Sequence, residues 1–297
     1  MILLAVIYGA IYILAPEKIE EPSKASEHPK PESKPTPKKE TQTESESKTI
    51  MNNSTIDEYL KSINFSGTAV VVREGKFVLN KGYGYSNRDT KQLNTPDTRY
   101  YIGSAQKALT AVSILQLSEQ GKIQVDDPIS RYLSEFPNGS QITIRNLLNH
   151  TSGIKGHIET NDVITPLELV QDIERRGIKR GPGKWNYQDS NYTVLSYLVE
   201  KLSGETLADF YKRHIFEPAG MNQVGFYSSF KNEKDRSVGY FLKKDGTYSV
   251  PSVPDLSQLF GVGNLYMSAS DMYRFDQALS SGKLLKQKKF FRNVHGW

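Results

Sequence analysis

One segment of the sequence, Ser104–Gln120, is long and apolar on several of its faces. Gly121 follows it, and a glycine just past the last turn is a common way for a helix to end. A helix whose apolar residues are not confined to one stripe is normally buried. The sequence therefore predicts a buried helix here, against which other elements have to pack.

The remaining pattern combines strands near the start with helices in the middle. Gly67–Arg73 and Lys76–Tyr85 flank Glu74-Gly75, which predicts a β-hairpin, and a second hairpin is predicted over 240–250 around Asp245-Gly246. The further helices predicted are 143–149, 166–176, 190–202, 206–214 and 268–279. Because no β-α-β alternation occurs, the predicted fold class is α+β.

The N-terminal part of the sequence has a different character. Residues 1–15 are almost wholly apolar but fall short of the roughly 20 residues that a membrane-spanning helix needs. From Pro16 to Lys48 the chain is Lys, Glu, Pro, Ser and Thr, which cannot bury enough apolar surface to fold. We expect 1–15 to be a signal-anchor or transmembrane segment, with a buried helix as the alternative, and 16–53 to be a disordered linker. The folded domain is then 54–285.

The C-terminal end lacks a clear structural period. Residues 286–297, KQKKFFRNVHGW, follow neither a strand nor a helix pattern. A hairpin alone is marginally stable and needs further strands, yet the sequence after Tyr85 offers few. We therefore expect the C-terminal strands of the sheet to be absent and 286–297 to be an aberrant tail on a truncated domain.

Composition narrows the possible chemistry. The chain of 297 residues contains no Cys, so disulfides, thiolate metal sites and a Cys nucleophile are ruled out. The net charge of +5 is compatible with an anionic wall or membrane surface. No nucleic-acid-binding signature occurs, and the five histidines show no metal-ligand spacing. We expect no cofactor and no nucleic-acid partner.

A Ser-x-x-Lys pattern occurs five times, and only one occurrence has a suitable context. The five serines are Ser45, Ser104, Ser152, Ser228 and Ser280. Ser104 opens the buried helix, where backbone N–H groups can stabilise an oxyanion. Lys107 lies one turn further on the same face, and its apolar neighbours favour the neutral amine that can take a serine proton. The alternative is a helix-capping serine with an unrelated surface lysine.

A second polar cluster lies at 181–192, GPGKWNYQDSNY, just before a predicted helix. Tyr187 could relay a proton, and Asp189 could hold Lys107 or a cation of the substrate. The alternative is a loop in which Asp189 or Ser190 only caps the helix.

Four ordered motifs are similar to those of the serine β-lactamase and penicillin-binding superfamily. They are Ile102–Lys107, Leu147–Gly153, Tyr187–Asp189 and Gly263–Met267. Within it the chain resembles the subfamily of FmtA-type teichoic acid D-alanine esterases of staphylococci, which carries Ser-Ala-Gln-Lys and Tyr-x-Asp. The resemblance runs from about Thr55 to Leu285. It implies a β-lactamase-like α+β fold with an antiparallel sheet flanked by helices and a helical subdomain.

The resemblance also implies roles for single residues. Ser104 matches the acylated nucleophile, Lys107 its base, Tyr187 the proton shuttle to the leaving group, and Asp189 the acidic third position. His150 and Ser152 match a structural stretch. His157 and His295 have no acidic partner that the sequence identifies, so a Ser-His-Asp triad is disfavoured.

The chain departs from the family pattern in one place. The family has a C-terminal strand that carries a Lys or His, then Thr, Ser or Gly, then Gly, and that supplies one oxyanion N–H. No such strand is recognisable after Leu285.

Three functions remain open at this level. The first is an esterase that removes D-alanine from teichoic acids at the outer face of the cell membrane or in the wall. The second is a penicillin-interacting D,D-peptidase or β-lactamase, which acts on a peptidoglycan stem peptide or on penicillin. The third is an inactive wall-binding protein.

Overall fold

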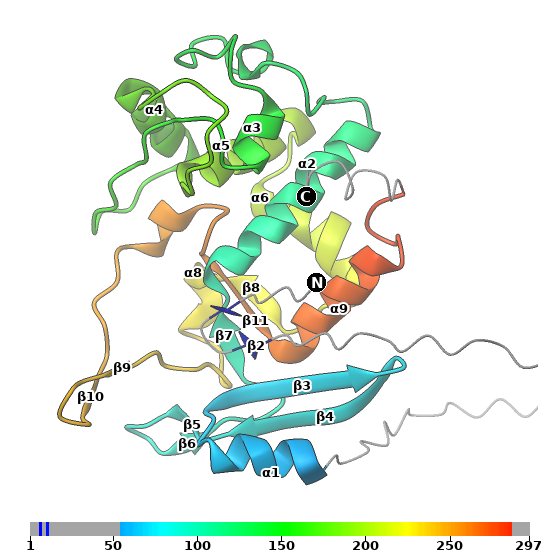
Figure 1. The fold of residues 1–297 in the computed structure, drawn as a ribbon, viewed down its shortest axis with the longest axis vertical. Helices are drawn as coiled ribbons and strands as arrows, with labels where there is room; N and C mark the ends of the chain where they lie inside the picture. Colours follow the sequence, from blue (N-terminus) through cyan, green and yellow to red (C-terminus); the bar gives the residue numbers. More distant parts are fainter. Residues whose placement is uncertain (1–5, 8–9, 12–53, 287–297) are drawn as a thin grey trace, which may run out of the picture.

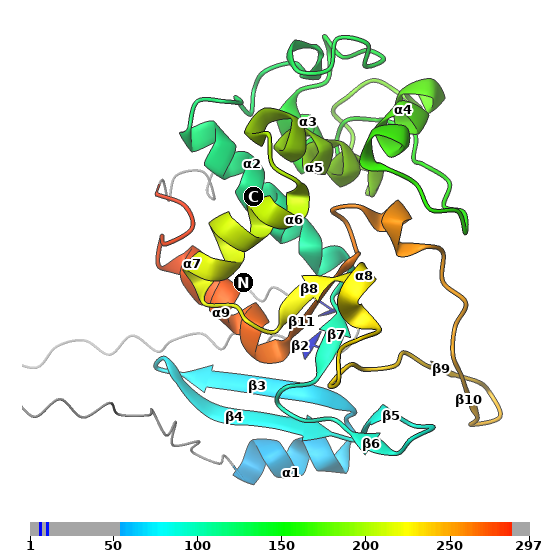
Figure 2. The same cartoon turned by 180° about the vertical axis from the view of Figure 1, so that it is seen from behind.

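The computed structural model describes residues 6–7, 10–11 and 54–286. A hairpin and its flanking helix lie at one end of the molecule, and a group of helices lies at the other (Figures 1 and 2). A small three-stranded sheet lies between them. The α+β class and the β-lactamase-like architecture expected from the sequence are confirmed.

The predicted first hairpin forms. β3 (Gly67–Arg73) and β4 (Lys76–Tyr83) pair antiparallel, and Glu74 and Gly75 make the turn, both with positive φ. Helix α1 (Ser54–Ser62) packs against β4. In the described part of the chain, no third strand joins this pair.

Several short strands do form after Tyr85, but in the described part of the chain they make separate sheets and none completes the β3–β4 hairpin. β7 (Arg99–Tyr101), β11 (Leu265–Ser268) and β8 (Val224–Phe226) form an antiparallel sheet in the order β7-β11-β8. These strands have only three or four residues each, so their alternation is too short to recognise in the sequence. Two-residue strands complete a second predicted hairpin, β9 (Phe241–Leu242) with β10 (Tyr248–Ser249). β5 (Tyr85–Asn87) pairs with β6 (Gln92–Leu93).

The buried helix predicted from the sequence is α2 (Gln106–Glu119), preceded by the 3₁₀ turn η1 (Gly103–Ala105). Leu109, Ile114 and Leu117 are fully buried, as a helix apolar on several faces requires. Polar residues on this helix find partners in the core: Thr110 Oγ1 bonds to Tyr211 Oη at 2.6 Å and to the Gly261 carbonyl at 2.9 Å. The helix carrying Ser104 at its entrance is thereby held by packing and by hydrogen bonds.

The helical part follows the predicted boundaries closely. Its main helices are α3 (Ile144–Leu148), α4 (Pro166–Arg176), α5 (Ser190–Ser203), α6 (Leu207–Tyr211), the π-helix η3 (Lys212–Phe216) and α9 (Ala269–Ser280). The short elements are η2 (Ile129–Arg131), α7 (Glu217–Ala219), α8 (Tyr227–Phe230) and η4 (Leu256–Leu259). Thr143 and Thr165 close capping boxes at α3 and α4, which explains why those two starts are readable in the sequence.

The structure describes only a few residues of the two terminal segments for which an anchor, a linker and a tail are predicted. Within 1–15 the described residues are β1 (Val6–Ile7) and β2 (Ala10–Ile11), which pair antiparallel. The linker 16–53 and nearly all of 286–297 lie outside the described residues. Among the helices that the structure describes, none combines the length and the apolar character needed to cross a membrane. The anchor and the tail remain predictions.

Candidate functional site

Ser104 lies where a strand turns into the buried helix. β7 ends at Tyr101, and the Ile102 N–H donates to the Leu265 carbonyl on β11 at 3.1 Å. Gly103 then takes φ +50°, which glycine adopts without a side-chain penalty, and the chain enters η1. Within the described residues the Ser104 N–H makes no hydrogen bond. It is therefore available to a substrate oxygen.

Lys107 contacts the serine directly. Its Nζ lies 2.8 Å from Ser104 Oγ and 3.4 Å from the Val262 carbonyl. The Lys107 side chain is only 8% exposed, because α2 carries it into the protein. The predicted pairing of these two residues across one helical turn is present in the structure.

Tyr187 and Asp189 complete a four-residue cluster. Tyr187 Oη donates to Ser104 Oγ at 2.8 Å, and Asp189 Oδ1 lies 3.0 Å from Lys107 Nζ. Asp189 occupies the N-cap position of α5, yet its side chain makes no capping hydrogen bond. Helix capping is therefore not what the carboxylate does: it faces the lysine. All four predicted site residues thus belong to one connected cluster, in which Ser104 contacts Lys107 and Tyr187, and Lys107 contacts Asp189.

His150 fixes the loop that delivers Tyr187. The His150 carbonyl accepts from the Asn186 N–H at 2.7 Å, and its Nδ1 accepts from the Gln188 N–H at 3.2 Å. Its ring lies on the Tyr187 ring, with centroids 4.5 Å apart. Burial, and secondly the nearby Lys107, lower the pKa of His150 from 6.5 to about 4. An uncharged imidazole that accepts a backbone hydrogen bond suits a supporting position.

Ser152 also lies behind the site. Its Oγ hydrogen-bonds to Asn191 Oδ1, while Lys155, three residues on, is exposed. The Ser-x-x-Lys pattern at Ser152 therefore does not bring its two side chains together as the pattern at Ser104 does.

The expectation that His157 lacks an acidic partner is wrong. Its Nδ1 lies 2.7 Å from Asp172 Oδ2 on α4, and its Nε2 lies 2.8 Å from Gln258 Oε1. Asp172 is fifteen residues away in the sequence, so no local sequence pattern predicts its contact with His157. Both ring nitrogens are occupied, which leaves neither free to act as a base for Ser104. A Ser-His-Asp triad remains disfavoured, for this reason.

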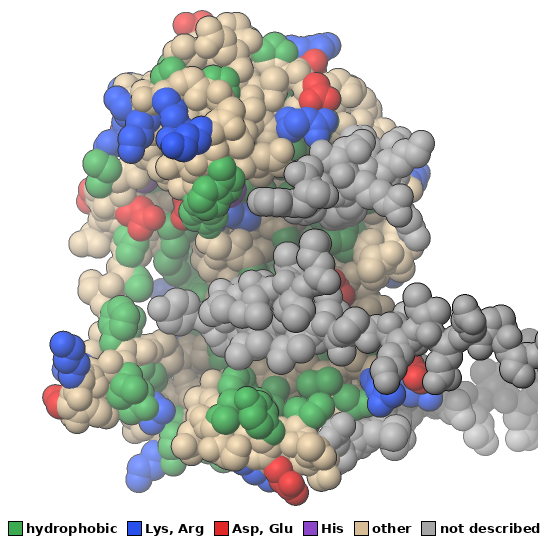
Figure 3. All heavy atoms as spheres, in the orientation of Figure 1, with side chains coloured by type: hydrophobic (Ala, Val, Ile, Leu, Met, Phe, Trp, Pro, Cys, Tyr) green, Lys and Arg blue, Asp and Glu red, His purple; other side chains and the backbone are tan. Residues whose placement is uncertain are grey.

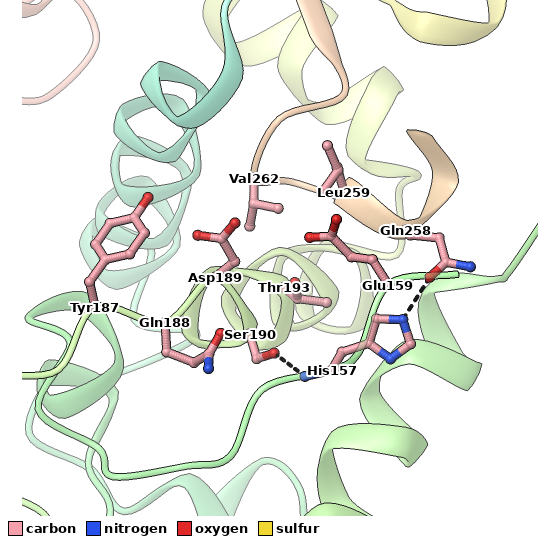
Figure 4. Close-up of a pocket in the computed structure, with 10 residues that line it drawn as sticks. All are labelled: His157, Glu159, Tyr187, Gln188, Asp189, Ser190, Thr193, Gln258, Leu259 and Val262. Atoms are coloured by element: carbon pink, nitrogen blue, oxygen red, sulfur yellow. Dashed lines mark hydrogen bonds between the residues drawn. The ribbon is translucent and has the colours of Figure 1, made fainter. Parts of the chain in front are cut away.

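A cavity of about 260 Å³ lies against this cluster (Figure 4). Its walls combine polar side chains with two apolar ones, and they come from the loop 157–159, the start of α5 and the segment around η4. The lining residues are His157, Glu159, Tyr187, Gln188, Asp189, Ser190, Thr193, Gln258, Leu259 and Val262. Tyr187 and Asp189 belong both to this wall and to the Ser104 cluster, so the cavity adjoins the serine. Among the described residues, no group of His, Asp and Glu side chains could hold a metal ion.

Comparisons with known proteins identify the family of the chain. The family described as Beta-lactamase matches residues 52–292. The chain belongs to this family, whose members are serine hydrolases. The candidate penicillin-binding protein PbpX of Bacillus subtilis (strain 168) is 56% identical over 239 residues, which make up 80% of this chain and 61% of that protein.

Two further matches concern staphylococcal proteins. Teichoic acid D-alanine hydrolase of Staphylococcus aureus is 34% identical over 237 residues, which cover 78% of this chain and 59% of that protein. The crystal structure of FmtA from Staphylococcus aureus superposes with a TM-score of 0.73 at 33% identity, covering 78% of this chain and 65% of that one. The chain thus spans about three fifths of the length of the curated relatives that it matches.

Proposed function

We propose that the protein hydrolyses esters through an acyl-serine intermediate, with Ser104 as the nucleophile. The observation that carries the proposal is that Ser104 Oγ lies 2.8 Å from both Lys107 Nζ and Tyr187 Oη. A serine hydroxyl is a weak nucleophile until a neighbouring group removes its proton. Two side chains capable of carrying that proton contact the oxygen, and one of them is almost fully buried.

The proposed reaction proceeds in two steps, acylation of Ser104 and hydrolysis of the acyl-serine. Lys107 in its unprotonated form accepts the proton of Ser104 as Oγ bonds to the ester carbonyl carbon. The Ser104 N–H stabilises the negative charge on the carbonyl oxygen. As the carbon–oxygen bond of the ester breaks, Tyr187 gives its hydroxyl proton to the leaving alkoxide and takes up the proton held by Lys107, which leaves an acyl-Ser104 with both side chains in their starting forms. Water then attacks the acyl carbon and loses a proton to Lys107, and Tyr187 and Lys107 deliver that proton to Ser104 Oγ as the acyl–Oγ bond breaks and the acid leaves.

Asp189 has a positioning role in this scheme. Its carboxylate, 3.0 Å from Lys107 Nζ, fixes the direction of the amine toward Ser104 Oγ. The ring of Tyr187, whose centre is 5.1 Å from the same Nζ, supports the amine from another side.

For the substrate we propose a D-alanyl ester on an anionic cell-wall polymer. The staphylococcal relative named as a teichoic acid D-alanine hydrolase supports this substrate class. An exposed basic surface also supports it. The bridge between Ile154 and Ile178 turns those side chains inward, so their neighbours Lys155 and Lys179 lie on the opposite, exposed face. Figure 3 shows Lys and Arg side chains gathered on the helical part of the molecule, where a polyanion could bind.

A second candidate is a penicillin-interacting D,D-peptidase or β-lactamase. The 56% identity to the candidate penicillin-binding protein PbpX favours it, and the same Ser104 chemistry would act on an amide. We also propose that the protein works at the outer face of the cell membrane or in the wall, tethered through the apolar residues 1–15. Full-length protein should then sediment with membranes, and a chain starting at Ser54 should not. Recovery of the full-length protein in the cytoplasmic fraction would contradict the tether.

The test compares substrates on one purified protein. A D-alanylated poly(glycerol phosphate), a D-alanyl-D-alanine peptide and a fluorescent penicillin would be offered to the wild type and to Ser104→Ala. The proposal predicts release of D-alanine from the ester by the wild type alone. Replacing both Lys155 and Lys179 by Ala should slow the polymer reaction and leave a small D-alanyl ester unaffected. Turnover of only the peptide or the penicillin would favour the second candidate.

A further inference from the structure

The cavity beside Ser104 adjoins the proposed reaction centre. Tyr187 Oη touches Ser104 Oγ, and Tyr187 and Asp189 both line the cavity wall. An acyl group bound to Ser104 would therefore place its substituents next to this space. The chemistry of the wall then decides which acyl groups fit.

Two carboxylates lie in this wall, and their surroundings differ. Asp189 faces Lys107 at 3.0 Å, so its charge is matched within the protein. Glu159 makes no hydrogen bond or ion pair with another residue that the structure describes, and it is exposed to solvent. Figure 4 shows both carboxylates pointing toward the side of the site where Val262 and Leu259 lie. The apolar side chains of Leu259 and Val262 lie on the same wall and would accept a small alkyl group.

The position of Glu159 is fixed by its neighbours in the chain. On one side the His157 N–H donates to Ser190 Oγ at 2.9 Å. On the other, the Thr160 N–H donates to Gln258 Oε1 at 2.9 Å, and Gln258 Nε2 donates back to Thr160 Oγ1 at 2.7 Å. The backbone on either side of Glu159 is thus hydrogen-bonded to two other residues of the cavity wall, Ser190 and Gln258. The Glu159 carboxylate, which has no partner among the residues that the structure describes, is therefore open to a cation from outside.

We propose that Glu159 binds the ammonium group of an α-aminoacyl substrate and so selects aminoacyl esters over simple acyl esters. In an α-aminoacyl ester the ammonium is attached to the carbon next to the carbonyl that Ser104 attacks. The carbonyl can then lie at Ser104 while the ammonium points into the cavity toward Glu159. A short side chain such as a methyl group would pack on Leu259 and Val262. This inference rests on the acyl-serine function proposed above.

The test uses covalent labelling, so it does not depend on turnover of any ester. The probes are two diphenyl phosphonates that react with the serine, one with a 1-aminoethyl group and one with an ethyl group. Their labelling rates would be measured on the full chain for the wild type, Glu159→Gln and Glu135→Gln. Glu135 is an exposed glutamate outside the cavity wall, so its variant controls for the loss of one negative charge.

The preference for the aminoethyl probe should fall roughly 2- to 5-fold in Glu159→Gln, a size typical of a solvent-accessible ion pair. Glu135→Gln should keep the wild-type preference. An unchanged preference in Glu159→Gln would overturn the assignment even if D-alanyl esters are hydrolysed. Normal labelling without hydrolysis of D-alanyl esters would leave Glu159 in place and refute only the proposed substrate. Failure of both probes to label the wild type would overturn the site and the role of Glu159 together.

Discussion

Gly261 lets a backbone segment approach the buried helices closely, and adding one methyl group there should be costly. Gly261 has φ +72°, and a Cβ at this position would overlap Oγ and Cβ of Ser196 on α5. The left-handed conformation costs a non-glycine residue about 1–2 kcal/mol, and overpacking adds about 1–3 kcal/mol. Gly261→Ala should therefore lower the free energy of unfolding by about 2–5 kcal/mol.

This destabilisation should extend to the site. The Gly261 carbonyl accepts from Thr110 on α2, and the next carbonyl, that of Val262, contacts Lys107 Nζ. Moving this segment away from Ser196 would shift both contacts and lower the rate of Ser104 labelling.

The assay is thermal unfolding, with Gly246→Ala as the matched control. Gly246 has a similar φ of +81°, but nothing lies within 4 Å of its added Cβ, so only the conformational cost applies. Gly261→Ala should melt lower than Gly246→Ala by roughly 2–12 °C, from about 2–4 °C per kcal/mol for a domain of this size. Ser196→Gly should recover part of the difference in the double variant. Equal melting temperatures of the two alanine variants would refute the packing argument.

Two further predictions concern residues around Ser104. Tyr187→Phe removes the hydroxyl that donates to Ser104 Oγ but keeps the ring on His150. The rate of hydrolysis should therefore fall about 100-fold or more without a change in melting temperature. An unchanged rate would exclude a proton relay through Tyr187. The pKa of His150 is lowered to about 4 from 6.5, so between these pH values the unfolded chain binds the extra proton. The contribution of the uncharged His150 to the free energy of unfolding is therefore complete above pH 6.5 and is lost as the pH falls toward 4. The loss is about 1 kcal/mol after discounting for partial exposure. The control is His150→Asn, because asparagine tolerates the positive φ of 56° at this position. Between pH 7.5 and pH 5 the melting temperature of His150→Asn should fall less than that of the wild type. An equal fall in both proteins would contradict this assignment.

The sequence predicts well those features that depend on local patterns. The burial of α2 follows from apolar residues on several faces, and the starts of α3 and α4 follow from the capping residues Thr143 and Thr165. The contact between Ser104 and Lys107 follows from helix geometry, which places residues three apart on one face.

The features that the sequence does not reveal depend on contacts between distant segments. β7 and β11 are short and pair across more than 160 intervening residues, so neither has a local signal. The partner of His157 is Asp172, and their contact depends on how α4 packs beside the loop before it. The sequence shows Asp189 beside a predicted helix start, where capping and contact with Lys107 are equally reasonable. The structure shows that the Asp189 carboxylate contacts Lys107 and does not cap the helix.

The most direct test of the central claim is to identify the residue that becomes acylated. The purified chain would be treated with a serine-directed phosphonate, and the modified peptide would be located by mass spectrometry in the wild type, Ser104→Ala and Lys107→Ala. We predict one adduct, on Ser104, absent from Ser104→Ala and much slower to form in Lys107→Ala. An adduct that persists in Ser104→Ala, or that maps to Ser152, would show that the nucleophile lies elsewhere.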